Sequence, residues 1–248
     1  MNNFVQRSIM VHIPIHVSSL FIALVFAIAF IIVISVHVCG LRLQLDFEER
    51  RRNMLVSILI IFVWLAFTNI IAMSGLLTDF TQMPPKLLLI TLPPLVFILI
   101  LFLSKPFHEL FESIGHFWII YAQSFRILME FILWLLYRYH VIPVQMTFEG
   151  RNFDILVGLS APFLAYFCFI KKSWSEKVAL LWNIVGLLVL ANIVVVAVLS
   201  TPYPFRYFMN EPANTIVFNF PFVWLPSFVV PFALLLHLIS IRRLLTKN

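Results

Sequence analysis

The sequence has little charge, few cysteines and no long polar segment, and each shortage restricts what the protein can be. Only 11% of its 248 residues are charged, whereas 62% are hydrophobic, and the mean hydropathy is +1.02. A soluble domain carries roughly 25% charged residues, so this chain lacks the polar surface that a water-facing domain requires. The loops between the apolar runs are too short for a soluble catalytic or binding domain. We therefore predict an all-α integral membrane protein.

The scarce polar residues exclude further classes of protein. The two cysteines, Cys39 and Cys168, lie near helix ends that we expect in the cytoplasm, where a disulfide would not persist. The net charge of +6 does not indicate nucleic acid as a partner, because the basic residues stand in short clusters beside apolar runs. The last apolar run, 222–241, has no lysine and so cannot hold a retinal Schiff base.

Seven apolar runs are long enough to cross a bilayer, which takes about 20 residues of α-helix. Their predicted ranges are 18–40, 54–77, 87–104, 116–139, 154–170, 178–200 and 222–241. The ends of the third and fifth runs are the ones we expect to shift most, and the fifth is the shortest. Together the runs predict a polytopic helix bundle in which residues 1–248 form a single transmembrane domain.

The basic residues set the orientation through the positive-inside rule. With the N-terminus outside, the inner side holds Arg42, Arg50, Arg51, Arg52, Lys105, Lys171, Lys172, Lys177, Arg242, Arg243 and Lys247. The outer side then holds only Arg7, Lys86, Arg138, Arg151 and Arg206. We therefore predict an outer N-terminus and a cytoplasmic C-terminus.

Three connections between the runs are more than simple turns. Segment 105–115 repeats apolar residues at intervals of three and four, which predicts an amphipathic helix at the inner interface before run 116–139. Segment 144–155 has two extended stretches around Gly150 and predicts a short hairpin. Segment 201–221 is long enough to fold over the bundle mouth. One set of charges gathers on the outer side: Arg138, His140, Glu149, Arg151, Asp154, Arg206 and Glu211. A selective vestibule or a partner-binding surface is one interpretation of this set, and solvated loop charges are the interpretation we favour.

The run 116–139 carries a polar face. Its polar and amphipathic residues recur at intervals of three, four and seven and continue into the preceding segment: Glu109, Glu112, His116, Gln123, Arg126, Glu130, Trp134 and Tyr137. All of them lie on one face of an α-helix. From His116 to Tyr137 this face rises about 32 Å at 1.5 Å per residue. We expect it to point into the bundle, away from lipid.

Arg126 and Glu130 lie near the middle of this face, where a lone charge costs at least about 2.5–3.5 kcal/mol. One interpretation makes them a ligand-binding site, in which the guanidinium holds an anionic group and the carboxylate accepts a hydrogen bond. The other makes them an ion pair at i and i+4 that fixes the helix against its neighbours. The predicted ligand-binding residues are Arg126, Glu130, Gln123, Asn183, Trp134 and Tyr137.

Histidines form a second group of candidate site residues, at the predicted inner boundary of the membrane. His37, His116 and His237 fall there together with Glu112, and histidine with carboxylate can hold zinc or iron. The spacing matches no diagnostic motif, since HELFESIGH is not HExxH. The simpler interpretation is interfacial histidines with one polar edge in water. We predict no metal site and keep these four residues as the alternative; no cofactor is indicated.

Three stretches give the chain a resemblance to other proteins. They read QSFRILMEFILWLLY at 123–137, VQMTFEGRNFDILVGL at 144–159 and FPFVWLPSFVVPFALL at 220–235. In these stretches, which cover roughly the second half, the chain resembles an uncharacterised family of bacterial seven-helix integral membrane proteins. The resemblance implies a location in the bacterial inner membrane and supplies no activity.

No motif identifies a reaction or a substrate, and we expect the protein not to be an enzyme. We predict that it binds or transports a small molecule or ion through a polar cavity beside the helix at 116–139. One alternative is a subunit of a larger complex, with a membrane-protein partner or a second copy of the chain. The other is an intramembrane metal-dependent enzyme acting on lipid at the inner leaflet. The lipid bilayer is a partner in each case.

Overall fold

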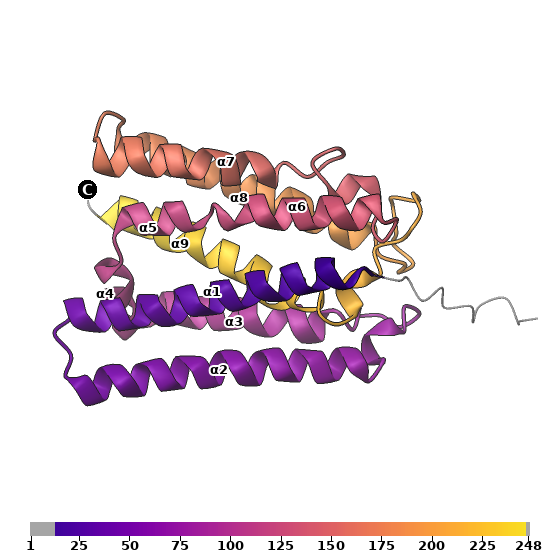
Figure 1. Cartoon of the computed structure of the whole chain (residues 1–248), viewed down its shortest axis with the longest axis horizontal. Coiled ribbons are helices and arrows are strands. Elements are labelled where there is room, and N and C mark those ends of the chain that lie inside the picture. Colours follow the sequence, from indigo (N-terminus) through magenta and orange to yellow (C-terminus); the bar gives the residue numbers. More distant parts are fainter. Residues whose placement is uncertain (1–12, 247–248) are drawn as a thin grey trace, which may run out of the picture.

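The structure is a computed structural model that describes residues 13–246, and within that range the chain is helical and contains no strand. The α-helices are α1 (Ile15–Arg42), α2 (Phe47–Met73), α3 (Leu88–Leu103), α4 (Lys105–Ser113), α5 (His116–Ala122), α6 (Phe125–Arg138), α7 (Asp154–Ala165), α8 (Glu176–Leu199) and α9 (Val230–Thr246). A π-helical turn, Tyr166–Ile170, extends α7, and another, Leu225–Val229, leads into α9. Figure 1 shows the long helices running side by side. The all-α prediction is confirmed.

Five helical spans within residues 13–246 are long and apolar enough to cross a membrane. They are Ile15–Arg42, Phe47–Met73, His116–Arg138, Glu176–Leu199 and Leu225–Thr246. Two further apolar helices, Leu88–Leu103 and Asp154–Ile170, are shorter, and they correspond to the third and fifth predicted runs. These lengths and compositions indicate a membrane protein whose helices contact lipid.

The helix α2 shows the lipid-facing surface most clearly. Asp46 caps its first turn by accepting a hydrogen bond from the Glu49 backbone N–H at 2.7 Å. Beyond this cap the helix lies at the edge of the bundle beside α1 (Figure 1), and large apolar side chains such as Phe62 and Ile70 are 68% and 65% exposed. Exposed apolar surface of this extent marks a membrane or protein interface, and on a long apolar helix it indicates contact with lipid.

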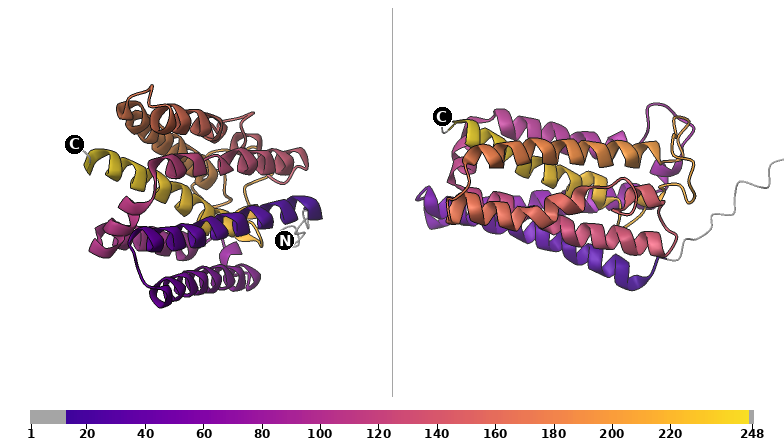
Figure 2. Two further views of the ribbon diagram at one scale, coloured as in Figure 1. Left: turned by 60° about the vertical axis from the view of Figure 1, so that its left-hand side comes forward. Right: turned by 90° about the horizontal axis from the view of Figure 1, so that it is seen from above.

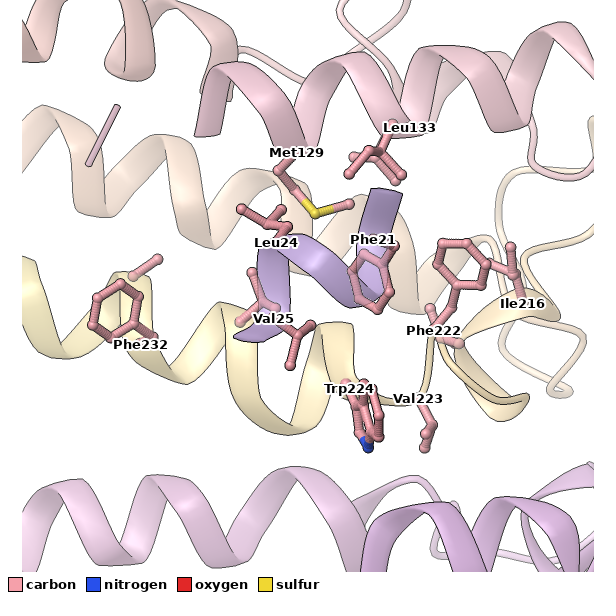
Figure 3. Packing of buried hydrophobic residues seen from close by; sticks show 14 of the residues in the cluster. Phe21, Leu24, Val25, Met129, Leu133, Ile216, Phe222, Val223, Trp224 and Phe232 are labelled. Atoms are coloured by element: carbon pink, nitrogen blue, oxygen red, sulfur yellow. The ribbon is translucent and has the colours of Figure 1, made fainter. Parts of the chain in front are cut away.

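The hydrophobic core lies where α1 meets α6 and the segment that leads into α9. Phe21 of α1 stacks on Phe222 with ring centroids 4.7 Å apart. Met129 and Leu133 of α6 point toward this cluster (Figure 3). The indole of Trp224 donates a hydrogen bond to the Leu65 carbonyl at 3.0 Å and so attaches α2 to the core.

The helix expected at 116–139 is interrupted between α5 and α6. The backbone N–H groups of Gln123 and Ser124 donate to carbonyls only three residues back, each at 3.0 Å, which tightens the chain into a turn. The polar face nevertheless points inward as expected, because Gln123, Arg126 and Glu130 are each 1% exposed. The first turn of α6 therefore places Arg126 deep in the bundle.

The predicted hairpin at 144–155 is wrong. The segment is a set of compact turns in which the Thr147 carbonyl accepts from the backbone N–H groups of Gly150 and Asn152 at 2.9 and 3.1 Å. Gly150 is required here, since a Cβ would lie 2.6 Å from the Cα of Gln145. Turn hydrogen bonds satisfy the backbone in place of a strand ladder.

The long connection at 201–221 lies across the ends of the helices, as Figure 1 and Figure 2 show. The Asn214 backbone N–H donates to the Ser200 carbonyl at 2.8 Å. Tyr203 and Phe218 are buried, and both pack edge-on against Phe80, with ring centroids 5.4 and 5.0 Å apart. This connection therefore covers one end of the bundle.

Some of the predicted features lie outside the described part of the chain. Arg7 and Lys247, which contribute to the predicted orientation, fall outside residues 13–246. The side chains of Lys105 and Glu109 are not described either. The predicted amphipathic segment does form a helix, α4, with Phe111 buried against the core.

Candidate functional site

The guanidinium of Arg126 reaches across to α7. Its Nη1 donates to Asp154 Oδ1 at 3.0 Å, and the two side chains are 2% and 13% exposed. The carboxylate that pairs with Arg126 thus belongs to a neighbouring helix, whereas the sequence suggested Glu130, one turn along the same helix. The pair joins two helices at a depth where a lone charge would be costly.

Gly158 brings α7 close enough to α6 for this pair to form. A Cβ at position 158 would lie 2.9 Å from the backbone nitrogen of Ile127 and 3.3 Å from Cβ of Arg126. Because one of these neighbours is backbone, it cannot move aside at little cost. Small residues of this kind allow close approach of membrane helices.

Glu130 is held from the loop that precedes α7. The side-chain amide of Asn152 donates to Glu130 Oε1 and to the Met146 carbonyl, the latter at 3.2 Å. The Asn152 Oδ1 accepts from the backbone N–H of Asp154 at 3.1 Å. Asn152 therefore holds the Glu130 side chain through its amide nitrogen and the backbone of Asp154 through its amide oxygen.

Several polar atoms in this group have no hydrogen-bond partner among the described residues. They are Nε and Nη2 of Arg126 and Oε2 of Glu130, and all three are buried. Nearly all buried polar atoms in proteins are hydrogen-bonded, and leaving one unsatisfied costs about 1–3 kcal/mol. Three buried polar atoms of this group thus have unused hydrogen-bonding capacity.

A cavity of 320 Å³ adjoins these residues. Arg126, Glu130, Asn152 and Asp154 line it, and Thr91, Thr201 and Asn214 add further polar groups. The rest of the wall is apolar and comes from α3, α6, α8 and the segment entering α9, as with Leu95, Met129, Leu133, Leu190, Val194 and Val229. The volume lies at the lower end of the range for small-molecule sites, about 300–1,000 Å³. The predicted polar cavity is therefore a largely apolar cavity with a polar group in its wall.

Three other predicted ligand-binding residues have different surroundings. Gln123 donates from Nε2 to the Ala233 carbonyl at 3.3 Å, which links the turn before α6 to α9. Trp134 donates from Nε1 to Glu149 Oε1 at 2.7 Å, with the Arg138 guanidinium 5.7 Å from its ring. Tyr137 is partly buried against the hydrophobic core. These contacts hold α6 in place along its length and at its C-terminal end.

Asn183 belongs to a separate polar cluster between α8 and α9. Its amide donates to the Ala179 carbonyl at 2.7 Å and to Ser240 Oγ at 2.9 Å. Its Oδ1 lies 2.9 Å from Nδ1 of His237. On α8 the cavity wall starts at Leu187, one turn beyond Asn183.

The four alternative metal ligands are not brought together. Within the part of the chain that the structure describes, no group of three His, Cys, Asp or Glu side chains could hold a metal ion. His237 hydrogen-bonds to Asn183, His116 stacks on Phe169 with centroids 5.1 Å apart, and His37 lies in a groove against α2. Glu112 lies on α4.

The sequence did not identify Asn152 and Asp154 as site residues. Asp154 was grouped with the solvated charges of the outer loops, yet it forms the buried ion pair. The sequence did contain one indication, because Asp154 stands at the start of an apolar run and begins α7. However, a carboxylate is favourable at any helix N-terminus, so the position of Asp154 did not by itself indicate a buried partner.

The fold and the site define a helical membrane protein with a buried ion pair beside an apolar cavity. The chain belongs to the family described as Domain of unknown function (DUF8737), whose model matches residues 83–245. The match includes α3 to α9 and every charged residue of the cavity. Comparison with the curated proteins and with the solved structures gives no match.

Proposed function

We propose that the protein is a seven-helix bundle of the bacterial inner membrane that binds a small molecule in the cavity beside α6. In this proposal the five long spans cross the bilayer together with two shorter ones, which are α3 and α7 with its π-helical turn. At 1.5 Å per residue the two shorter helices reach about 24–26 Å. The bilayer can thin by this small difference from its usual thickness of about 30 Å.

The distribution of basic residues supports an outer N-terminus and a cytoplasmic C-terminus. The turn between α1 and α2, the helix α4 and the C-terminal end of α9 lie at one end of the bundle (Figure 1). Arg42, Arg50 and Arg243 belong to these parts of the chain. Such an end faces the cytoplasm under the positive-inside rule.

The single observation that carries the binding proposal is the set of unpaired polar atoms in the cavity wall. Nε and Nη2 of Arg126 and Oε2 of Glu130 lack partners among the described residues, and both side chains line a space of 320 Å³. A bound molecule would satisfy these atoms and at the same time fill the apolar space. A bare ion would leave most of the apolar wall uncovered, so the arrangement favours an organic molecule.

Native mass spectrometry of the protein purified in a mild detergent tests the proposal. We expect the wild-type protein to retain a stoichiometric molecule beyond bulk lipid and detergent, and Glu130→Gln to lose it while keeping the wild-type Tm. Glu149→Gln is the matched control, because it makes the same change in an exposed carboxylate outside the cavity wall. A wild-type protein without such a molecule, or equal retention by both variants, would contradict the proposal.

A further inference from the structure

We infer that the cavity takes an uncharged, single-tailed lipid with a hydroxyl-bearing head group, and that this lipid enters sideways from the bilayer between α3 and α8. The inference rests on the proposed function and adds to it the class of ligand and the route of access. It follows from the charge of the cavity wall, the hydrogen-bonding capacity of its polar atoms, and the exposure of the residues between the two helices.

The charges of the wall disfavour an anionic head group. Arg126 supplies one positive charge, and it is already neutralised by Asp154 at 3.0 Å. Glu130 adds a carboxyl group to the same wall and no positive charge. The wall therefore offers no net positive charge to a phosphate or carboxylate head, which would lose its hydration on entering a site of low polarity. A neutral head group avoids this cost.

The unpaired atoms suit a group that can both accept and donate hydrogen bonds. Nε and Nη2 of Arg126 need acceptors, and Oε2 of Glu130 needs a partner of its own. A hydroxyl group has one donor and two acceptor lone pairs, so a single hydroxyl can serve both residues and a diol can serve all three atoms. A hydroxyl pairs with the Glu130 carboxyl in either of its protonation states, whereas an ether or ester oxygen can only accept.

The apolar wall fits the tail of such a molecule. Away from the polar group the cavity is lined by leucine, isoleucine, valine and methionine side chains of α6, α8 and α9. A volume of 320 Å³ suits part of one chain rather than the two chains of a membrane phospholipid. A tail that leaves lipid for this apolar space exchanges one apolar environment for another and gains little from hydrophobic burial. The head group therefore sets the selectivity.

The route of access follows from residues that belong to the cavity wall and are also exposed. Leu95 of α3 is 41% exposed and Val194 of α8 is 37% exposed, and both line the cavity. The helices α3 and α8 run along the same side of the molecule (Figures 1 and 2). The exposed surface on this side faces lipid, so a membrane-dissolved molecule reaches the cavity without crossing the outer loops.

The experiment uses the full chain in phosphatidylcholine nanodiscs and two photoactivatable probes. One probe is a monoacylglycerol with a diazirine in its tail, and the other is the fatty acid with the same tail. Crosslinked peptides are identified by mass spectrometry. We expect the monoacylglycerol to label residues of the cavity wall at least about tenfold more than the fatty acid, a difference of 1.4 kcal/mol or more in binding.

Two tryptophan variants of α8 test the route. Val194→Trp narrows the space between α3 and α8, whereas Leu188→Trp places the same bulk at a site that is 66% exposed and outside the cavity wall. We expect labelling to develop about tenfold more slowly in Val194→Trp and at the wild-type rate in Leu188→Trp. The Tm of each variant is measured, and Leu95→Trp replaces Val194→Trp if the latter is unstable.

The outcomes separate the inference from the proposed function. Stronger labelling by the fatty acid would overturn the head-group assignment, and unchanged labelling in Val194→Trp would overturn the lateral route; either result leaves a ligand in the cavity. Absence of cavity labelling by both probes would overturn the inference. If native mass spectrometry also finds the wild-type protein empty, the proposed function fails as well.

Discussion

Two polar clusters are buried in this bundle, and they differ in the space around them. In the first, Arg126 and Glu130 leave three polar atoms without partners among the described residues, next to 320 Å³ of open volume. In the second, between Asn183, His237 and Ser240, Nε2 of His237 also lacks a described partner. That atom faces Gly186, where a Cβ would lie only 2.7 Å from it.

The difference shows which feature marks a binding site. Both clusters join helices, and both contain polar atoms without a described hydrogen-bond partner. The presence of buried polar side chains alone therefore does not distinguish ligand binding from helix packing. The residues of the Arg126 cluster line a cavity, whereas Nε2 of His237 is closely covered by Gly186. We therefore assign ligand binding to the Arg126 cluster and helix packing to the His237 cluster, and four substitutions test that assignment.

The largest effect is expected from Arg126→Met. The substitution leaves the Asp154 carboxylate buried and unpaired, which destabilises proteins by about 3–5 kcal/mol. The measurement is the Tm in detergent, with Arg138→Met as the matched control, since Arg138 lies on the same helix and is exposed. Adding Asp154→Asn to Arg126→Met should recover part of the loss. Equal Tm values for Arg126→Met and Arg138→Met would contradict a stabilising ion pair.

The next effect is expected from Gly158→Ala. The added methyl meets the backbone nitrogen of Ile127 at 2.9 Å, so α7 must shift away from α6. Overpacking of this kind costs about 1–3 kcal/mol, and the shift also separates Asp154 from Arg126. We expect a lower Tm and weaker retention of the ligand. A Tm at or above that of wild type would show that the two helices are not in close contact.

Gly186→Ala makes the same change beside the other cluster. Here the methyl meets the imidazole of His237, a side chain held by Asn183. A cost of about 1–3 kcal/mol is again expected, and the double variant Gly186→Ala with His237→Ala should be less destabilised than the sum of the single variants. Strict additivity of the two ΔΔG values would mean that the side chains do not meet.

The smallest effect is expected from Asn183→Ala. Hydrogen bonds between membrane helices contribute about 0.6 kcal/mol on average and at most about 1.7 kcal/mol. The Tm should therefore fall slightly, while retention of the ligand stays at the wild-type level. Loss of the ligand in Asn183→Ala, with the fold intact, would remove the distinction between the two clusters.

The inward polar face of the helix at 116–139 was predictable from the sequence. Lipid tolerates charged side chains so poorly that helical periodicity alone assigned Gln123, Arg126 and Glu130 to the bundle interior, and all three are buried. The all-α class followed from composition for the same reason. These predictions depend on the solvent around the helices and not on how particular helices pack.

Features that depend on packing between distant segments were not predictable. The partner of Arg126 is 28 residues away in sequence, and Asn152 reaches Glu130 from a loop that read as a hairpin. The turn at Gln123 interrupts a run with no glycine or proline to mark it. The cavity is mostly apolar, so its walls read as ordinary membrane helix. Such details follow from tertiary contacts that override local preference.

The most direct test of the central claim is an experimental density map of the wild-type protein in lipid, at a resolution that shows side chains. The account predicts elongated density in the cavity, with its polar end against Nη2 of Arg126 and Oε2 of Glu130 and its tail toward the gap between Leu95 and Val194. The opposite result would be a closed cavity in which Arg126 pairs with both Asp154 and Glu130. That result would make the cluster a structural ion-pair network and contradict the proposed binding site.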